Sequence, residues 1–316
     1  MTLRLILPVK TTFAYWLLWA ILINQAQCCS SPVSRKNVIM SAEQGYAYPE
    51  LLISTETLNN DLNENTQLTI IDVRPNGDFR KGHIPGAINL QWTHCTYPSG
   101  SKAWQLLPLW IVQLRLGLAG ISRGDKIVIY GDQETGWGED GRFFWMFSYF
   151  GHDNFRILNG GWNQWKLEGR STTNKIKFSF PTWYRAEIRP ELLADKNWMK
   201  ENYKKSGIAV IDARSPEEYK GAVLYGEPRG GHIPGAKSLP WKETIGSDYK
   251  IKPAEELQRM LSSIGVEPGK ETAVYCTGGV RSGHLYFVLK LLGYQKVRNY
   301  DGSFQEWAAD PELPVE

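Results

Sequence analysis

The chain repeats one long sequence pattern, and this repeat limits its architecture more than any other feature. The segment TIIDVRPNGDFRKGHIPGAINLQW, residues 69–92, returns as AVIDARSPEEYKG…GGHIPGAKSLPW at 209–241, with extra residues around 221–230. Farther along, residues 126–165 return at 271–307. Equivalent positions lie 140 to 149 residues apart, which indicates a duplicated domain and not a short-period solenoid. A chain of 316 residues has room for two such domains.

Each copy alternates short β-branched runs with helical stretches. In the second copy, residues 208–212 (IAVID) and 272–276 (TAVYC) are typical of buried strands. Residues 253–265 form an amphipathic helical pattern that stops at a glycine, and residues 282–293 form another. This alternation predicts an α/β fold with a parallel sheet flanked by helices in each half. Ligands bind beyond the carboxyl ends of such strands, where Cys276 lies.

The repeat divides the chain into a first domain, a linker and a second domain. We expect the first domain at 45–170 and the second at 192–316. The segment between them, 171–191, is polar and shows little periodicity, so it is the expected linker.

Residues 1–29 have the pattern of an export signal. Arg4 and Lys10 precede an apolar stretch at 13–23, which is short for a membrane span and ends at NQAQCCSS. Cleavage, an uncleaved anchor, or a lipid on Cys28 or Cys29 would each fit this pattern. We therefore expect an exported protein, periplasmic or membrane-anchored, whose contact with a membrane is limited to this signal or lipid.

Composition excludes several classes of function. The chain is 42% apolar and 22% charged, which is the balance of a globular protein. A net charge of +3 without any Lys/Arg run argues against nucleic-acid binding. Three histidines, His94, His152 and His284, have no metal-ligand spacing, and we expect no metal. Beyond the signal only Cys95 and Cys276 remain, and a disulfide between them is one interpretation in an oxidising compartment.

The loop after the strand at 272–276 has the residues that activate a thiol. Gly278 and Gly279 let successive backbone N–H groups point inward around Cys276. A helix that starts near Ser282 directs its positive end at the same space, and Arg281 adds a formal charge. A helix N-terminus and a nearby cation both lower the pKa of a thiol. Such a loop would hold a thiolate, a persulfide or the oxyanion of a sulfur donor.

On these motifs the chain resembles the tandem-domain rhodaneses, a family of sulfurtransferases, over about residues 45–314. The resemblance is carried by the paired GHIPGA segments and by YCTGGVRSG, which is similar to the family's active-site loop. It implies two rhodanese-like domains, each a small parallel sheet flanked by helices, with the active site facing the cleft between them. It also implies that the C-terminal domain alone keeps the cysteine. Gly131 and Asp132 stand where the second half has Cys276.

The resemblance implies a double displacement that needs no cofactor. Cys276 would attack the sulfane sulfur of a small-molecule donor, thiosulfate or 3-mercaptopyruvate, and become a persulfide. An acceptor such as cyanide or a thiol would then take the outer sulfur. Arg281 would stabilise negative charge, and the hydroxyls of Thr277 and Ser282 are secondary candidates. The backbone N–H groups expected to hold the sulfur and the leaving anion belong to Thr277, Gly278, Gly279 and Val280.

The loop gives a mixed indication of the donor. In the family, basic loop residues go with thiosulfate and small neutral residues with 3-mercaptopyruvate, whereas CTGGVR is neutral until its last position. An exported protein is more consistent with an inorganic sulfur donor than with a cytosolic keto acid, so thiosulfate is the expected donor.

Other polar residues of the repeat have less specific roles. We expect His83, Arg185 and Arg189 as candidate residues of the cleft between the domains. A further set at the strand ends is expected to fix loops through local ion pairs: Asp72, Arg74, Asp212 and Arg214.

Two alternatives use the same fold. Dual-specificity phosphatases place five residues between cysteine and arginine, whereas four separate Cys276 from Arg281, which favours sulfur over phosphate. The other alternative is an exported rhodanese-like module that binds a partner or senses redox state without catalysis.

Overall fold

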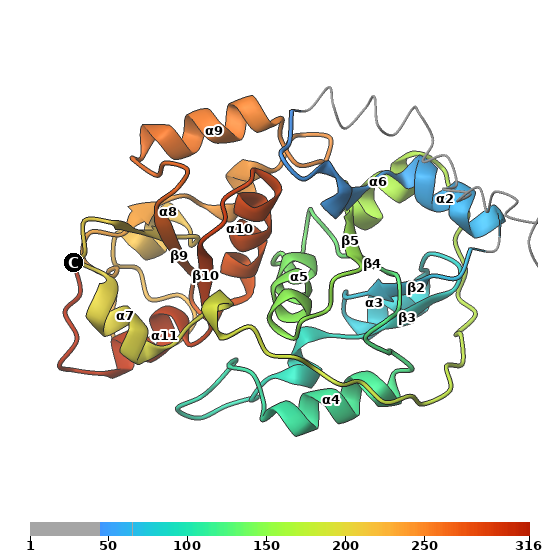
Figure 1. Cartoon of the computed structure of the whole chain (residues 1–316), viewed down its shortest axis with the longest axis horizontal. Coiled ribbons are helices and arrows are strands. Elements are labelled where there is room, and N and C mark those ends of the chain that lie inside the picture. Colours follow the sequence, from blue (N-terminus) through green and yellow to red (C-terminus); the bar gives the residue numbers. More distant parts are fainter. Residues whose placement is uncertain (1–44, 65) are drawn as a thin grey trace, which may run out of the picture.

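A computed structural model describes residues 45–64 and 66–316, and within them two similar α/β units follow each other along the chain (Figure 1). The apolar stretch at 13–23, Cys28 and Cys29 lie outside the described residues. Among the described residues, no helix has both the length and the apolar character needed to cross a membrane.

The first unit is built on a five-stranded parallel sheet with strand order β1-β5-β4-β2-β3. Its central strand, β4, has four buried residues, as expected for a parallel sheet covered on both faces. The strands are β1 (Leu52–Ile53), β2 (Thr69–Asp72), β3 (Ala87–Asn89), β4 (Ile127–Tyr130) and β5 (Phe155–Leu158). The helices are α2 (Thr55–Asn63), α3 (Asn76–Lys81), α4 (Leu109–Leu118), α5 (Glu139–Tyr149) and α6 (Gly161–Leu167), with short 3₁₀ turns η1 (Pro49–Leu51) and η2 (Trp92–Cys95).

The second unit repeats the topology, with strand order β6-β10-β9-β7-β8, again all parallel. The predicted α/β fold with two domains is therefore confirmed. The strands are β6 (Leu193–Ala194), β7 (Ile208–Asp212), β8 (Lys237–Ser238), β9 (Glu271–Tyr275) and β10 (Val297–Tyr300). The helices are α7 (Lys196–Asn202), α8 (Pro216–Tyr219), α9 (Ala254–Ser263), α10 (Val280–Leu291) and α11 (Ser303–Ala309), with 3₁₀ turns η3 (Pro190–Leu192) and η4 (Trp241–Thr244).

Two equivalent helices, α5 and α10, join the units along their length (Figure 1). Each has a glycine at the crossing: a Cβ on Gly141 would lie 2.6 Å from the His284 backbone nitrogen, and one on Gly283 would lie 2.7 Å from Arg142 Cα. Next to the crossing, the rings of Phe144 and Phe287 pack edge to face at 4.9 Å. One hydrophobic core thus continues through both units and holds them together.

Two segments near the expected domain limits make contacts that the repeat does not indicate. Tyr46, assigned to the first domain, packs on the second, and its buried hydroxyl lies 2.9 and 2.8 Å from the carbonyls of Ile251 and Lys252. The predicted linker 171–191 follows the surface of the first unit, where Thr173 pairs with His83. A side-chain hydroxyl fixes the first segment and backbone hydrogen bonds fix the second.

Candidate functional site

Cys276 directly follows β9, and the backbone around it is fixed by α11. The Cys276 N–H donates to Ser303 Oγ at 3.2 Å, and the Phe304 N–H donates to the Cys276 carbonyl at 2.9 Å. The side chain is 1% exposed. Cys95 is a second buried free thiol, so the two cysteines do not form a disulfide.

The sulfur of Cys276 lies in the expected loop of backbone N–H groups. The Gly279 N–H donates to Sγ at 3.1 Å, and Ser282 Oγ lies 3.7 Å from Sγ. Gly279 has φ +79°, and a Cβ there would lie 2.5 Å from Arg142 Nη1. The position requires glycine both for its backbone conformation and for space.

The two thiols differ in acidity. Burial raises the pKa of Cys276, but the charge of Arg281, the Ser282 N–H and hydroxyl, and the Gly278 N–H outweigh it, so the pKa is below its ordinary value. Burial raises the pKa of Cys95 to about 12. Of these two described cysteines, Cys276 has the environment of a reactive thiolate.

Arg281 is paired with a carboxylate that the sequence analysis did not identify. Its Nη1 and Nη2 donate to the two carboxylate oxygens of Glu218 at 2.6 and 2.7 Å, and Nη2 also donates to Thr277 Oγ1 at 2.6 Å. Burial raises the pKa of Glu218, but the bonds to Arg281 lower it below its ordinary value. Arg281 therefore acts on Cys276 through its charge while its hydrogen bonds hold Thr277.

Sequence reasoning missed Glu218, although a local signal was present. In SPEEY, Ser215 and Glu218 form a capping box at the start of α8, which directs the Glu218 carboxylate inward. Nothing in the local sequence indicated that Glu218 pairs with Arg281, which lies 63 residues later in the chain.

Aromatic side chains from both units surround the Arg281 guanidinium. Trp137 of the first unit and Tyr225 of the inserted segment 221–230 meet edge to face at 5.2 Å. The guanidinium lies 5.3 and 5.5 Å from their ring centroids, within cation–π distance. From the same insertion, Glu227 Oε1 accepts a bond from Thr277 Oγ1 at 3.4 Å. The extra residues of the second copy thus belong to the site.

A loop of the first unit, residues 97–106, covers the cysteine loop. Trp104 of this loop has φ +68° and lies against Gly278. A Cβ added to Gly278 would lie 2.9 Å from Trp104 Cδ2 and closer still to Trp104 Cε3. The Leu106 N–H donates to Asp301 Oδ2 at 2.8 Å. In Figure 1 this loop projects from the N-terminal side of α4 toward α11.

Arg142 of α5 ties the first unit to the same loop. Its Nη1 donates to the Gly279 carbonyl at 3.0 Å, and its Nη2 pairs with Asp301 Oδ1 at 2.6 Å, with the side chain fully buried. The sequence did not indicate this role, because Arg142 and Gly279 are 137 residues apart.

The equivalent position in the first unit has no thiol. The Val73 N–H donates to the Tyr130 carbonyl as the Ala213 N–H does to Tyr275, which places Gly131 where Cys276 stands. Asp132 follows, and its Oδ1 accepts the N–H groups of Glu134 and Thr135 at 2.9 Å.

The strand-end ion pairs have the expected structural role. Arg74 and Arg214 each donate to the aspartate two residues earlier at 2.6 Å, and all four side chains are buried. The same guanidiniums reach the carbonyls of Gly82 and Gly231, and so fix the loops that start with GHIPGA.

The structure does not bring the three candidate cleft residues to Cys276. His83 is buried in the first unit, with Nδ1 2.8 Å from the Phe79 carbonyl and Nε2 3.2 Å from that of Lys175. Arg189 pairs with Asp153 at 2.5 Å, and Arg185 is exposed on the linker. Among the described residues none of these three side chains has a hydrogen bond or ion pair with the Cys276 loop, so their place in the cleft stays a prediction.

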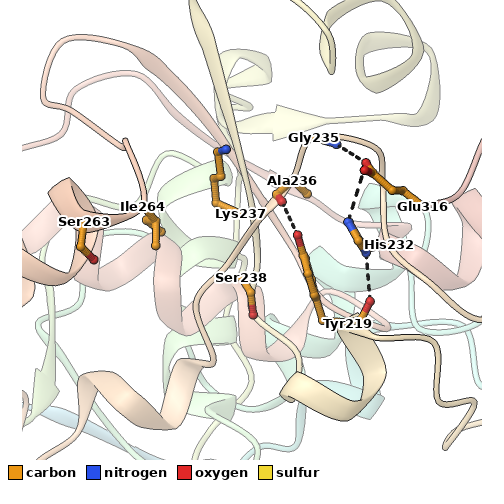
Figure 2. A pocket seen from close by; sticks show the side chains of 9 residues that line it. All are labelled: Tyr219, His232, Gly235, Ala236, Lys237, Ser238, Ser263, Ile264 and Glu316. Atoms are coloured by element: carbon orange, nitrogen blue, oxygen red, sulfur yellow. Dashed lines mark hydrogen bonds and ion pairs between the residues drawn. The ribbon is translucent and has the colours of Figure 1, made fainter.

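A separate cavity of about 530 Å³ lies at the β8 edge of the second unit. Figure 2 shows His232 there, with Nδ1 2.9 Å from the Tyr219 carbonyl and Nε2 3.9 Å from Glu316. No residue of the Cys276 loop lines it.

Comparisons with known proteins agree with this architecture. The Rhodanese-like domain family matches residues 54–168 and 195–310. The chain is 35% identical to the sulfur carrier protein TtuD of Thermus thermophilus, covering 86% of this chain and 98% of that protein. It is 30% identical to a thiosulfate sulfurtransferase of Corynebacterium glutamicum, covering 87% and 93%. The wild-type structure of EanB has the same fold, with a TM-score of 0.77 at 24% identity over 85% of this chain and 69% of that one.

Proposed function

Because this chain belongs to the rhodanese family and is a sulfurtransferase, we propose that it moves the outer sulfur of thiosulfate to a thiol or cyanide through a persulfide on Cys276. The observation that carries the proposal is the Cys276 sulfur, held 3.1 Å from the Gly279 nitrogen with its pKa below the ordinary value. This is the environment that a thiolate nucleophile needs.

The proposed reaction has two displacements. The Cys276 thiolate attacks the sulfane sulfur of thiosulfate, and the S–S bond of the donor breaks with its electron pair leaving on sulfite. The outer sulfur of the resulting persulfide is then attacked by cyanide or a thiolate, which regenerates the Cys276 thiolate. The Gly279 N–H stabilises the sulfur that carries negative charge at the start and the end of the cycle.

A second donor, 3-mercaptopyruvate, is supported by the pairing of Arg281. Glu218 neutralises the guanidinium with two hydrogen bonds, and Glu227 adds a further carboxylate beside Thr277. A singly charged keto acid meets less repulsion there than a dianion. The names of several relatives favour thiosulfate, so steady-state rates with each donor and one acceptor decide between them.

Mass spectrometry of the intact protein after treatment with donor tests the nucleophile. We expect one added sulfur on Cys276 and none in Cys276→Ser, which keeps the fold because the hydroxyl is similar in size. Cys95→Ser is the matched control and should behave as the parent does. A persulfide on Cys95, or full activity in Cys276→Ser, would overturn the assignment. A persulfide that forms without turnover would favour the non-enzymatic redox-sensing alternative.

Export remains part of the proposal, supported by Arg4, Lys10 and the apolar stretch at 13–23. Fractionation of cells that express the full chain tests it: the protein should be found in the exported or membrane fraction. Recovery from the cytosolic fraction alone would contradict it.

A further inference from the structure

Most of the exposed large apolar side chains of the first unit lie on α4 and on the linker beside it. We call this surface the α4 face. Its members are between 50 and 87% exposed, far more than is usual for large apolar side chains. They are Trp110, Leu114 and Leu118 from α4, and Ile176, Phe178, Phe180 and Trp183 from the linker.

The two parts of the α4 face form one surface. Trp110, Leu114 and Leu118 recur every four residues and so form a stripe along the outer side of α4. The linker runs beside the helix: the Thr182 N–H donates to the Gly117 carbonyl and the Thr182 hydroxyl to that of Ile121, both at 2.8 Å. Figure 1 shows this segment passing α4 at the lower edge of the view.

Gly117 on α4 and Gly120 just after the helix allow this close approach. A Cβ on Gly120 would lie 2.6 Å from Ser179 Cβ, and one on Gly117 would clash with the Thr182 carbonyl. Beyond this contact, the exposed rings of Phe178 and Phe180 pack on each other at 5.3 Å. The linker is therefore held against the helix with its large apolar side chains facing outward.

The segments that form the α4 face carry charge of one sign. Residues 96–124 and 169–186 contain no Asp or Glu, although the chain has 33 of them. On the linker, Lys175 and Lys177 alternate with Ile176 and Phe178, and both lysines are exposed. The cations of the two segments are Lys102, Arg115, Arg123, Arg170, Lys175, Lys177 and Arg185. Of these, Arg123 and Arg170 pair with Glu187 and Glu168, which flank the linker segment.

We propose that the α4 face is a peripheral docking surface for an anionic phospholipid bilayer. Tryptophan and phenylalanine side chains insert at the boundary between headgroups and acyl chains, and lysine and arginine beside them attract anionic headgroups. A second copy of the chain is the weaker candidate, because two such faces would bring the exposed Lys175 and Lys177 of both copies opposite one another. This surface is independent of the N-terminal signal.

Docking on the α4 face also sets the position of the sulfur-transfer site. Residues 97–106 directly precede α4, and Trp104 of this loop covers Gly278. On a docked molecule the loop over Cys276 therefore lies next to the bilayer surface.

Vesicle flotation tests the proposal. Every protein in this experiment is the full chain with Leu17→Asp and Leu18→Asp, so that the apolar stretch at 13–23 does not itself insert into the vesicles. We expect it to float with vesicles of equal parts phosphatidylcholine and phosphatidylglycerol and not with phosphatidylcholine alone. Adding Lys175→Glu and Lys177→Glu should lower the bound-to-free ratio at least tenfold, because each cation near an anionic surface contributes a factor of about five.

The apolar contribution has its own variant and controls. Phe180→Ser with Trp183→Ser should also lower the bound-to-free ratio at least tenfold. Each CH₂ that no longer inserts loses about 0.8 kcal/mol of binding free energy, which lowers the ratio by a factor of about four. Lys200→Glu with Lys204→Glu changes the same charge on the second unit, and Leu167→Ser removes an apolar side chain exposed on α6, outside the α4 face. Both controls should bind as the parent does, and every variant should keep its thermal midpoint and persulfide formation.

Two results would overturn the proposal. One is equal flotation of the parent and of Lys175→Glu/Lys177→Glu. The other is a concentration-dependent dimer that Phe180→Ser/Trp183→Ser abolishes while vesicle binding stays absent, which would make the α4 face an interface between copies.

Discussion

Replacing Gly278 by alanine should displace the loop that covers the cysteine. The added Cβ would lie 2.9 Å from Trp104 Cδ2 and 3.1 Å from Trp104 Cβ, nearer than carbon atoms pack. Forcing extra volume into such a contact costs about 1–3 kcal/mol of unfolding free energy. Since Gly278 lies between Cys276 and the Gly279 N–H that binds its sulfur, a shift of about 1 Å should lower kcat/KM by about 10²-fold.

A double-mutant cycle with Trp104→Ala measures this contact. Trp104→Ala removes the ring that the new methyl group meets, so Gly278→Ala should cost less in that background than in the parent. Urea unfolding of the four proteins should give an interaction free energy of about 1–3 kcal/mol in the direction of rescue, and sulfur-transfer rates should follow the same order. Additive effects within about 0.5 kcal/mol would show that Trp104 does not pack on Gly278 in solution.

Three further predictions concern charged groups. Burial raises the pKa of Glu139 to about 7 from an ordinary 4.5, so the stability that this side chain contributes is fully present below pH 4.5 and is lost as the pH rises through 7. Glu139→Gln should therefore raise the unfolding free energy by about 3 kcal/mol at pH 8 in urea titrations, and should leave it unchanged near pH 4.5. An equal gain at both pH values would contradict this. Arg281→Ala leaves Glu218 buried without its partner, so we expect a loss of about 3–5 kcal/mol in unfolding free energy. The pKa of Cys276, measured from the pH dependence of its alkylation rate, should rise, and Arg281→Lys should recover only part of both effects. An unchanged alkylation profile would mean that the backbone N–H groups suffice to lower the Cys276 pKa. Asp132→Cys should add no second persulfide, since that turn has no equivalent cradle, and two sulfurs per chain by mass spectrometry would refute it.

Local sequence patterns were sufficient to predict the fold and the position of Cys276 at the end of a strand. The runs TIID and IAVID are apolar over the length of a strand and became β2 and β7, because side-chain burial in a parallel sheet requires that pattern. Gly279 and the strand before it could likewise be identified, since the sharp turn into α10 needs a positive φ. The cradle around Cys276 is made by residues within six positions of it.

The surroundings of that loop were decided only by the tertiary structure. Glu218 reaches Arg281 across 63 residues, and Arg142 reaches Gly279 across 137. The sequence placed His83, Arg185 and Arg189 in the cleft, whereas in the structure His83 is held by the carbonyls of Phe79 and Lys175 and Arg189 pairs with Asp153. The periodicity of the sequence indicates which face of a helix or strand is buried. Which residues of the other unit contact that face depends on how α5 and α10 cross. That crossing is set by the packing of Gly141 and Gly283 on the facing helices, a contact that no local pattern in the chain encodes.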